Sequence, residues 1–231
     1  MPIPVLCYHK VGPESEEGRR LNIAPEQLRR HVRYFKRRGY RFSLGRDLTN
    51  MATQSKTVCF TFDDGYLSTL THGREALLAE GVRASIYVVS GLIGKASTWD
   101  GELARPLADL PILTTALAEG FEIGNPTSGH QWLGRLPARE QAAAISECKT
   151  FLEGAGAGLT SVCYPYGSLN EQTVEVARDM GFGVGMALGG RLARLGDEPL
   201  ALPRVVIAFS DAVPMLIYRL FMRPLLKRRP H

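Results

Sequence analysis

The sequence lacks both a segment that would span a membrane and a segment typical of secretion. No stretch reaches about 18 uninterrupted apolar residues, the length that a membrane-spanning helix requires. The first ten residues, MPIPVLCYHK, contain no basic region, and Pro4 interrupts their short apolar run. These absences predict a cytoplasmic protein.

Cysteine is also scarce, and no two cysteines have the CxxC spacing of many metal and redox sites. Three of the four lie in apolar, strand-like runs, which favours buried free thiols over a disulfide or a zinc-thiolate site. Free thiols suit a reducing compartment. The four are Cys7, Cys59, Cys148 and Cys163.

Acidic residues are outnumbered by basic ones, which gives a formal net charge of +5 and a pI near 9.1. The basic residues concentrate at 29–38 and 223–231. Around the first run, Leu28, Val32 and Phe35 recur at helical spacing, which predicts a helix with a solvated basic face. Because no recognised nucleic-acid-binding motif accompanies this charge, no nucleic-acid partner is expected.

The segment from about 211 to 228 is predicted to form a basic amphipathic helix. One interpretation is the last packing helix of the fold. The other is a peripheral contact with the inner face of an anionic membrane, where each nearby basic residue adds about 1 kcal/mol. Both interpretations rest on the same residues: the apolar Met215, Leu216, Leu220 and Phe221 and the basic Arg219, Arg223 and Lys227.

Strand-like and helical segments alternate along the chain, with no internal repeats and no linker, so the 231 residues are predicted to form one domain. TVCFTF (57–62) is the strongest strand because it is rich in β-branched and aromatic residues. A helix is predicted from about Tyr66 to Glu80, another after a cap at Asn170, and an irregular stretch up to about Pro111. The alternation predicts an α/β fold of parallel strands with outer helices, closed or nearly closed as a barrel.

Polar residues follow several of these strands. His9 ends the first strand, Asp63 and Asp64 end the strongest, and the loops 124–130 and 164–167 follow later ones. Chemistry in parallel α/β barrels collects at the carboxyl ends of the strands, so these are the candidate site residues. The alternatives are structural: an aspartate turn that caps the next helix, and a histidine that only makes hydrogen bonds.

Three motifs occur in the order and spacing of a known family. TFDDGY (61–66), EIGN-x-T-x-x-H (122–130) and YPYG (164–167) together resemble the polysaccharide deacetylase family, also called the NodB-homology or carbohydrate esterase family 4 domain. The resemblance covers nearly the whole chain. It implies a distorted (β/α)7 barrel and a hydrolase that removes N-acetyl, and sometimes O-acetyl, groups from a saccharide with one divalent metal, expected to be zinc.

The resemblance assigns roles position by position. Asp63 matches the general base, Asp64 the metal-binding aspartate, and His130 the second histidine of the usual H-[ST]-x-x-H ligand pair. The first histidine of that pair falls on Pro126, so one expected metal ligand is absent.

Two more departures concern the catalytic groups. The usual R-x-P-Y motif is CYPY here (163–166), without the arginine that orients the catalytic aspartate, and the usual late histidine is missing. LCYHKV (6–11) resembles the first strand of permuted deacetylases that act on biofilm polysaccharides, which makes His9 the candidate general acid. Arg204 in LPRVVI resembles a position where such chains keep an arginine near the active aspartate. The Tyr166 backbone is expected to hold the oxyanion, and the residues expected to contact the sugar are Tyr164, Pro165, Tyr166 and Trp132.

We therefore predict metal-dependent hydrolysis of an N-acetyl group on a saccharide, which could be lipid-linked, with an activity that Pro126 impairs or alters. The alternative is a catalytically silent glycan-binding protein on the same fold; deformylation of a lipid-linked sugar is a third interpretation. Water or an oxygen of Asn125 or Thr127 could fill the ligand gap, although neutral oxygens bind zinc less well than imidazole. Pro126 could also be an altered residue, because histidine and proline codons differ by one base.

Overall fold

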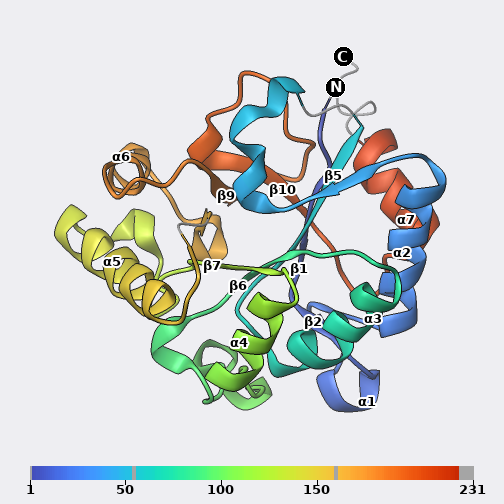
Figure 1. Cartoon of the computed structure of the whole chain (residues 1–231), viewed down its shortest axis with the longest axis horizontal. Helices are drawn as coiled ribbons and strands as arrows, with labels where there is room; N and C mark the ends of the chain where they lie inside the picture. The colour runs from blue at the N-terminus through green and yellow to red at the C-terminus, as the bar shows by residue number, and fades with distance from the viewer. Residues whose placement is uncertain (1, 54–55, 159–160, 224–231) are drawn as a thin grey trace.

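Seven parallel strands form the central sheet of the computed structural model, which describes residues 2–53, 56–158 and 161–223 (Figure 1). The sheet runs in the order β7, β6, β5, β1, β10, β9, β8, so β1 lies at its centre although it comes first in the chain. The strands are β1 (Val5–Tyr8), β5 (Thr57–Phe62), β6 (Ser85–Tyr87), β7 (Glu122–Gly124), β8 (Val162–Cys163), β9 (Gly185–Leu188) and β10 (Leu202–Val206).

A single residue joins the two ends of this sheet. Asn125, just after β7, forms a parallel bridge with Val162 of β8. Its backbone N–H donates to Ser161 O at 3.1 Å, and its carbonyl accepts from Cys163 N at 2.7 Å. The sheet is therefore a nearly closed barrel, which confirms the predicted distorted (β/α)7 architecture.

Three short strands lie outside this path. β4 (Arg41–Ser43) pairs with the beginning of β5, and β2 (Lys10–Val11) pairs with β3 (Asn22–Ile23). The second pair forms a small separate ribbon directly after β1.

Helices surround the barrel, with α5 and α6 on one side and α2, α3 and α7 on the other (Figure 1). Their bounds are α1 (Glu14–Glu17), α2 (Pro25–Arg37), α3 (Arg74–Ala79), α4 (Leu110–Ala118), α5 (Ala138–Gly154), α6 (Glu171–Asp179) and α7 (Val213–Ile217). Short 3-10 helices cover Gly45–Thr53, Ser90–Leu92, Thr98–Leu103, Leu133–Arg135, Pro165–Gly167 and Pro199–Ala201, and π-helical turns cover Thr69–Gly73 and Tyr218–Met222.

Side-chain caps explain where two of these helices begin. Asn170 accepts a hydrogen bond from Thr173 N and closes a capping box at the start of α6, which confirms the predicted cap. Asp109 accepts from Ile112 N at 3.1 Å and starts α4, with Pro111 in the first turn. The prediction of an irregular stretch up to Pro111 did not include this helix.

The helix predicted from about Tyr66 to Glu80 is present, and its helical residues run from 67 to 79. Tyr66 forms an antiparallel bridge with Leu107, and its carbonyl accepts the first helical hydrogen bond, from Leu70 N at 3.3 Å. The chain then passes through the π-helical turns at Thr69–Gly73 before α3 begins.

The hydrophobic core lies on both sides of the strands. Alternate strand residues pack outward against the helices, and a second cluster, including Val5, Cys59 and Leu202, fills the barrel interior. All four cysteines are buried and free, as predicted. Within the part of the chain that the structure describes, no helix is both long and apolar enough to span a membrane.

Candidate active site

Strand alternation decides which side chains point into the barrel. The even-numbered residues of β5 pack outward against the helices, so Thr61 and, just past the strand, Asp63 point inward. The same period of two turns His9 inward after β1 and Arg204 inward on β10. Because β1 lies between β5 and β10, these polar side chains meet at the carboxyl end of the barrel.

Arg204 holds the carboxylate of Asp63 in a bidentate ion pair. Nη1 lies 2.6 Å from Oδ1 and Nη2 lies 2.7 Å from Oδ2. The guanidinium is fully buried and also donates to Thr61 Oγ1 (2.9 Å) and Ala187 O (3.1 Å). Burial alone would raise the pKa of Asp63, but the charge and hydrogen bonds of Arg204 outweigh it and lower that pKa. Asp63 is therefore a fixed, ionised carboxylate.

The guanidinium that the CYPY segment lacks is supplied by a different strand. Cys163 occupies the position where the R-x-P-Y motif has its arginine. Its Sγ lies 3.1 Å from Nη2 of Arg204, so the guanidinium of β10 reaches the same place. The missing arginine of β8 therefore does not leave Asp63 unoriented.

His9 lies beside Asp63. It is half-buried, and its Nδ1 has no hydrogen-bond partner among the described residues. His9, Asp63 and Cys7 each place one potential ligand atom here, and these three atoms lie within 4.8 Å of one another. Cys7 Sγ also donates a hydrogen bond to Asp63 Oδ2 at 3.3 Å. The charge of His9 contributes to the lowered pKa of Asp63. A potential proton donor and a carboxylate thus share one pocket.

Asp64 and His130 form a second polar pair. Nε2 of His130 lies 3.0 Å from Oδ1 of Asp64, and both side chains are almost fully buried. The imidazole stacks on Trp99 with ring centroids 4.1 Å apart, and its Nδ1 lies 3.1 Å from the hydroxyl of Tyr166. Contacts to both ring nitrogens and to one ring face fix the orientation of His130.

Unfavourable backbone conformations gather here. Asp64, Thr127, His130 and Tyr166 have φ values of 74°, 85°, 54° and 59°. They are four of the six non-glycine residues with positive φ in the described chain. Such conformations cost free energy and persist where the surrounding structure imposes them, often at functional sites.

The two polar pairs, Asp63 with Arg204 and Asp64 with His130, line one cavity of about 190 Å³. That is smaller than the roughly 300–1,000 Å³ of pockets that enclose whole small molecules. The cavity is therefore large enough for one small chemical group and too small for a whole sugar chain. Its lining includes His9, Asp63, Asp64, Tyr66, Trp99, Asp100, Pro126, His130, Tyr166 and Arg204.

Residues 50–185 match the family model described as polysaccharide deacetylase. The chain belongs to the polysaccharide deacetylase family. Members of this family are hydrolases that act on carbon–nitrogen bonds other than peptide bonds. The matched segment contains Asp63, Asp64 and His130, whereas His9 and Arg204 lie outside it.

Relatives of known sequence or structure agree with this membership. Over 212 residues the chain is 24% identical to YxkH of Bacillus subtilis (strain 168), provisionally named a polysaccharide deacetylase, and the match covers 89% of this chain and 71% of YxkH. PplD, a Streptococcus pyogenes deacetylase solved with acetate, superposes with a TM-score of 0.80 at 21% identity over 95% of this chain and 98% of PplD. IcaB from Ammonifex degensii superposes with a TM-score of 0.78 at 26% identity over 93% and 95%.

Polysaccharide deacetylases are generally metal-dependent, which raises the question of which residues of this chain could bind a metal ion. Asp64 and His130 supply two donors, and Pro126, which lines the same cavity, supplies none. The neighbouring oxygens are engaged: Asn125 Oδ1 accepts from Thr127 N at 2.8 Å, and Thr127 Oγ1 accepts from His130 N at 3.1 Å. These contacts do not favour Asn125 or Thr127 as replacement ligands.

A second group of potential ligands, Cys7, His9 and Asp63, is no better suited to a cation. Both oxygens of Asp63 bind Arg204, whose positive charge would repel a metal ion. Burial raises the pKa of the Cys7 thiol, so it stays protonated. Catalytic zinc sites normally have three protein ligands. Neither set fits such a site, and the chemistry proposed below uses only groups of the protein itself.

The residues expected to contact the sugar occupy different positions. Tyr166 is 39% exposed at the cavity, and Pro165 lines it. Tyr164 also borders the cavity, but its ring is buried and its hydroxyl donates to Leu200 O at 2.7 Å. Trp132 is not among the lining residues and instead stacks on Tyr166 at 4.1 Å.

Part of the cavity wall was not predicted from the sequence. Asp100 Oδ2 accepts from the Tyr66 hydroxyl at 2.6 Å, and Trp99 Nε1 lies 3.2 Å from the same hydroxyl. Arg20 faces Asp100 at 3.9 Å. Tyr66 ends the TFDDGY motif and could have been proposed from it. Trp99 and Asp100 lie in a segment with no strand or helix periodicity, so no local pattern marks them.

Proposed function

We propose that this chain hydrolyses the N-acetyl amide of a saccharide whose acetamido group enters the cavity at Asp63. The observation that supports this proposal is the placement of His9 within 4.8 Å of a carboxylate that Arg204 orients. Amide hydrolysis needs a group that takes a proton from water and a group that gives one to the departing amine. Asp63 and His9 are suited to these two roles.

In the proposed reaction, Asp63 accepts a proton as the oxygen of a water molecule bonds to the acetyl carbon. The backbone N–H of Tyr166 is proposed to stabilise the resulting oxyanion, an effect worth about 3–4 kcal/mol per donor. The carbon–nitrogen bond then breaks, and protonated His9 gives its proton to the amine nitrogen. Acetate and the free amino sugar leave, and proton transfer from Asp63 to His9 through solvent restores the site.

The bidentate contact with Arg204 limits this chemistry. A general base works best when its pKa lies near the working pH, and the pKa of Asp63 is lowered. We therefore expect the rate enhancement due to Asp63 to lie near the low end of the usual range for a general base.

Asp63→Asn is expected to reduce acetate release from N-acetylated oligosaccharides about a hundredfold, because asparagine keeps the shape but cannot accept the proton. Asp179→Asn, on the exposed face of α6, removes the same charge away from the cavity and should leave the rate unchanged. Acetate measured after fixed times with each variant checks this prediction. Equal rates for wild type and Asp63→Asn would assign the base to another group.

Tyr166→Ala is expected to weaken binding of an N-acetylated oligosaccharide about two- to tenfold, because the exposed ring at the cavity is lost. Tyr166→Phe keeps the ring and removes only the hydroxyl next to His130, so binding should be retained. Titration calorimetry with all three forms distinguishes these results. Similar weakening in both variants would mean that the hydroxyl, and not the ring, governs binding.

A second candidate function is glycan binding without hydrolysis. The incomplete ligand set at Asp64, His130 and Pro126 favours it, because the cavity and the aromatic side chains persist without a third metal donor. Saccharide binding with no acetate release from wild type, at any concentration of added zinc or cobalt, would support this candidate over the first.

A further inference from the structure

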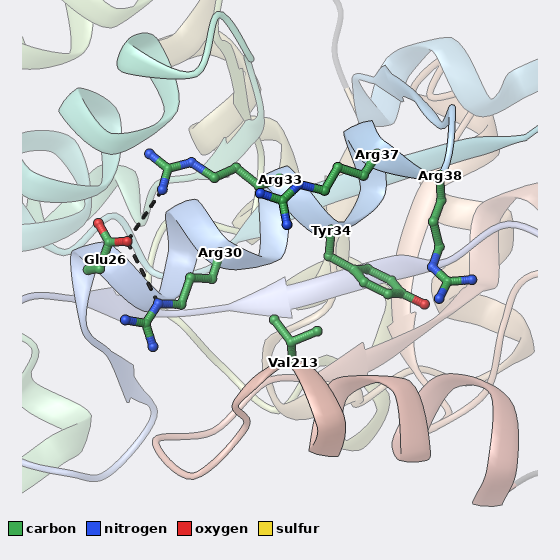
Figure 2. Close-up of a pocket in the computed structure, with 7 residues that line it drawn as sticks. All are labelled: Glu26, Arg30, Arg33, Tyr34, Arg37, Arg38 and Val213. Carbon is green, nitrogen blue, oxygen red and sulfur yellow. Dashed lines mark ion pairs between the residues drawn. The ribbon is translucent and has the colours of Figure 1, made fainter.

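A groove separates α2 from α7 on the outer surface of the barrel (Figure 2). Its volume is about 640 Å³, and it is lined by Glu26, Arg30, Arg33, Tyr34 and Arg37 of α2, by Arg38 just after α2 and by Val213 of α7. An adjoining hollow shares Tyr34, Arg37 and Arg38 and extends to Lys56, Ile217 and Phe221. One wall is thus cationic and the other is apolar.

The two ends of the groove differ in charge. At one end, Glu26 pairs with Arg30 (3.7 Å) and Arg33 (3.5 Å), as Figure 2 shows. At the other end, Arg37, Arg38 and Lys56 are exposed, and none of them forms an ion pair within the described residues. The Arg38 guanidinium lies 4.9 Å from the centre of the Tyr34 ring. This end therefore has a local excess of positive charge.

The C-terminal helical segment, whose Val213, Ile217 and Phe221 line the groove and the adjoining hollow, also carries exposed apolar side chains outside that lining. Leu216 and Leu220 are buried, whereas Met215, Tyr218 and Met222 are 42%, 42% and 51% exposed. Their spacing of three and four residues places the exposed three along one side of the segment. Single exposed apolar residues are ordinary, but an aligned set on the helical segment that forms one wall of a basic groove is characteristic of an interfacial surface.

We propose that this face, made of α2, α7 and the turns at Tyr218–Met222, docks on an anionic lipid bilayer. Arg37, Arg38 and Lys56 would contact lipid phosphates, and Met215, Tyr218 and Met222 would enter the boundary between headgroups and acyl chains. A nucleic acid would match the cations but not the exposed methionines. A second copy of the chain pairing through the same face would bring like charges together.

Docking through this face would hold the cavity near saccharides carried on lipids. That consequence rests on the proposed function, whereas membrane docking does not. A binding measurement alone can therefore fail or succeed independently of any deacetylase activity.

The test is flotation of the full chain with vesicles of phosphatidylcholine alone or of equal parts phosphatidylcholine and phosphatidylglycerol. We expect binding only to the anionic vesicles, weakened by added salt. Arg37→Glu/Arg38→Glu should reduce the partition coefficient at least about tenfold. Each basic residue near an anionic surface changes this coefficient severalfold. Tyr218→Ser/Met222→Ser should reduce it about tenfold while keeping the salt dependence.

The matched control is Arg139→Glu/Arg194→Glu, which has the same net charge as the first variant. Arg139 lies on α5, across the barrel from α2, and Arg194 lies in the loop after β9 (Figure 1). Circular dichroism and thermal midpoints confirm that each variant is folded. Docking through this face is refuted if wild type does not float with anionic vesicles, or if the control loses as much binding as Arg37→Glu/Arg38→Glu. It is also refuted if Tyr218→Ser/Met222→Ser binds vesicles and duplex DNA as wild type does, because the surface would then recognise polyanions in general.

Discussion

Arg204→Leu is expected to lower the free energy of unfolding by about 3–5 kcal/mol at neutral pH. The substitution leaves the buried carboxylate of Asp63 without the two hydrogen bonds of 2.6 and 2.7 Å that neutralise it. It also leaves Thr61 Oγ1 and Ala187 O without their buried donor. Urea unfolding of both forms, followed by tryptophan fluorescence, measures the difference.

Two comparisons identify the cause of this loss. Arg178→Leu breaks an exposed pair with Glu198 at 3.2 Å and should cost at most about 1 kcal/mol. Adding Asp63→Leu to Arg204→Leu should recover part of the stability, because no buried charge then lacks a partner. A double variant as unstable as the sum of the two single variants would show that the two residues act independently.

Acid should reduce the effect of Arg204→Leu. The folded pKa of Asp63 lies below its ordinary value of 3.8, so its contribution to stability is complete above that value and is lost as the pH falls through the folded pKa. In the leucine variant, protonation removes the buried charge. The stability difference between the two proteins should therefore shrink toward the acid limit.

Pro126→His is expected to raise the affinity for zinc more than about a hundredfold. Changes to groups that only contact the ligands already alter metal affinity about 10–100-fold, and this substitution adds a ligand. Asp64 Oδ1 and His130 Nε2 are 3.0 Å apart, close to the roughly 3.3 Å that separates two ligands of a tetrahedral zinc ion with bonds of about 2.0 Å. Titration calorimetry with zinc, and cobalt absorption spectra that report coordination geometry, measure the change.

Pro126→Ala is the control for this experiment, because it removes the proline ring without adding an imidazole. It should bind zinc no more tightly than wild type. If wild type already binds one zinc ion as tightly as Pro126→His, another residue completes the site and the interpretation of Pro126 as a lost ligand is wrong. Acetate release that rises together with zinc affinity would show that hydrolysis on this fold depends on the metal that the added imidazole binds.

The sequence predicts some elements to the residue and misses others for identifiable reasons. β5 (Thr57–Phe62) coincides with its predicted range, because β-branched and aromatic residues fill a strand buried on both faces. α4 was missed because Pro111 was interpreted as part of an irregular stretch. A proline in the first turn favours a helix when Asp109 caps it.

In the candidate site, too, residues in local sequence motifs were predicted, whereas contacts that depend on tertiary packing were missed. Asp63, Asp64 and His130 were found because they lie in motifs next to strong strands. The contact between Cys163 and Arg204 depends on β8, β9 and β10 lying side by side, which no local pattern encodes. Trp132, which was expected to contact the sugar, is exposed and stacks against Tyr166 at the edge of the cavity, and its contact with a sugar stays a prediction. Trp99 lines the cavity directly, because tertiary packing, and not hydrophobicity, decides which tryptophan reaches it.

The central place of β1 also sets the order in which the barrel can fold. β1 pairs with β5 on one edge and with β10 on the other. β1 is synthesised first and β10 last, so one edge of β1 stays unpaired until the whole chain has been made. Parallel pairing between such distant segments forms slowly and leaves strand edges exposed in the meantime. Until β10 docks, Asp63 also lacks the guanidinium that neutralises it. The ion pair that neutralises the buried carboxylate of Asp63 thus depends on the last strand of the barrel, and a nascent chain has no oriented carboxylate at position 63 before β10 pairs with β1.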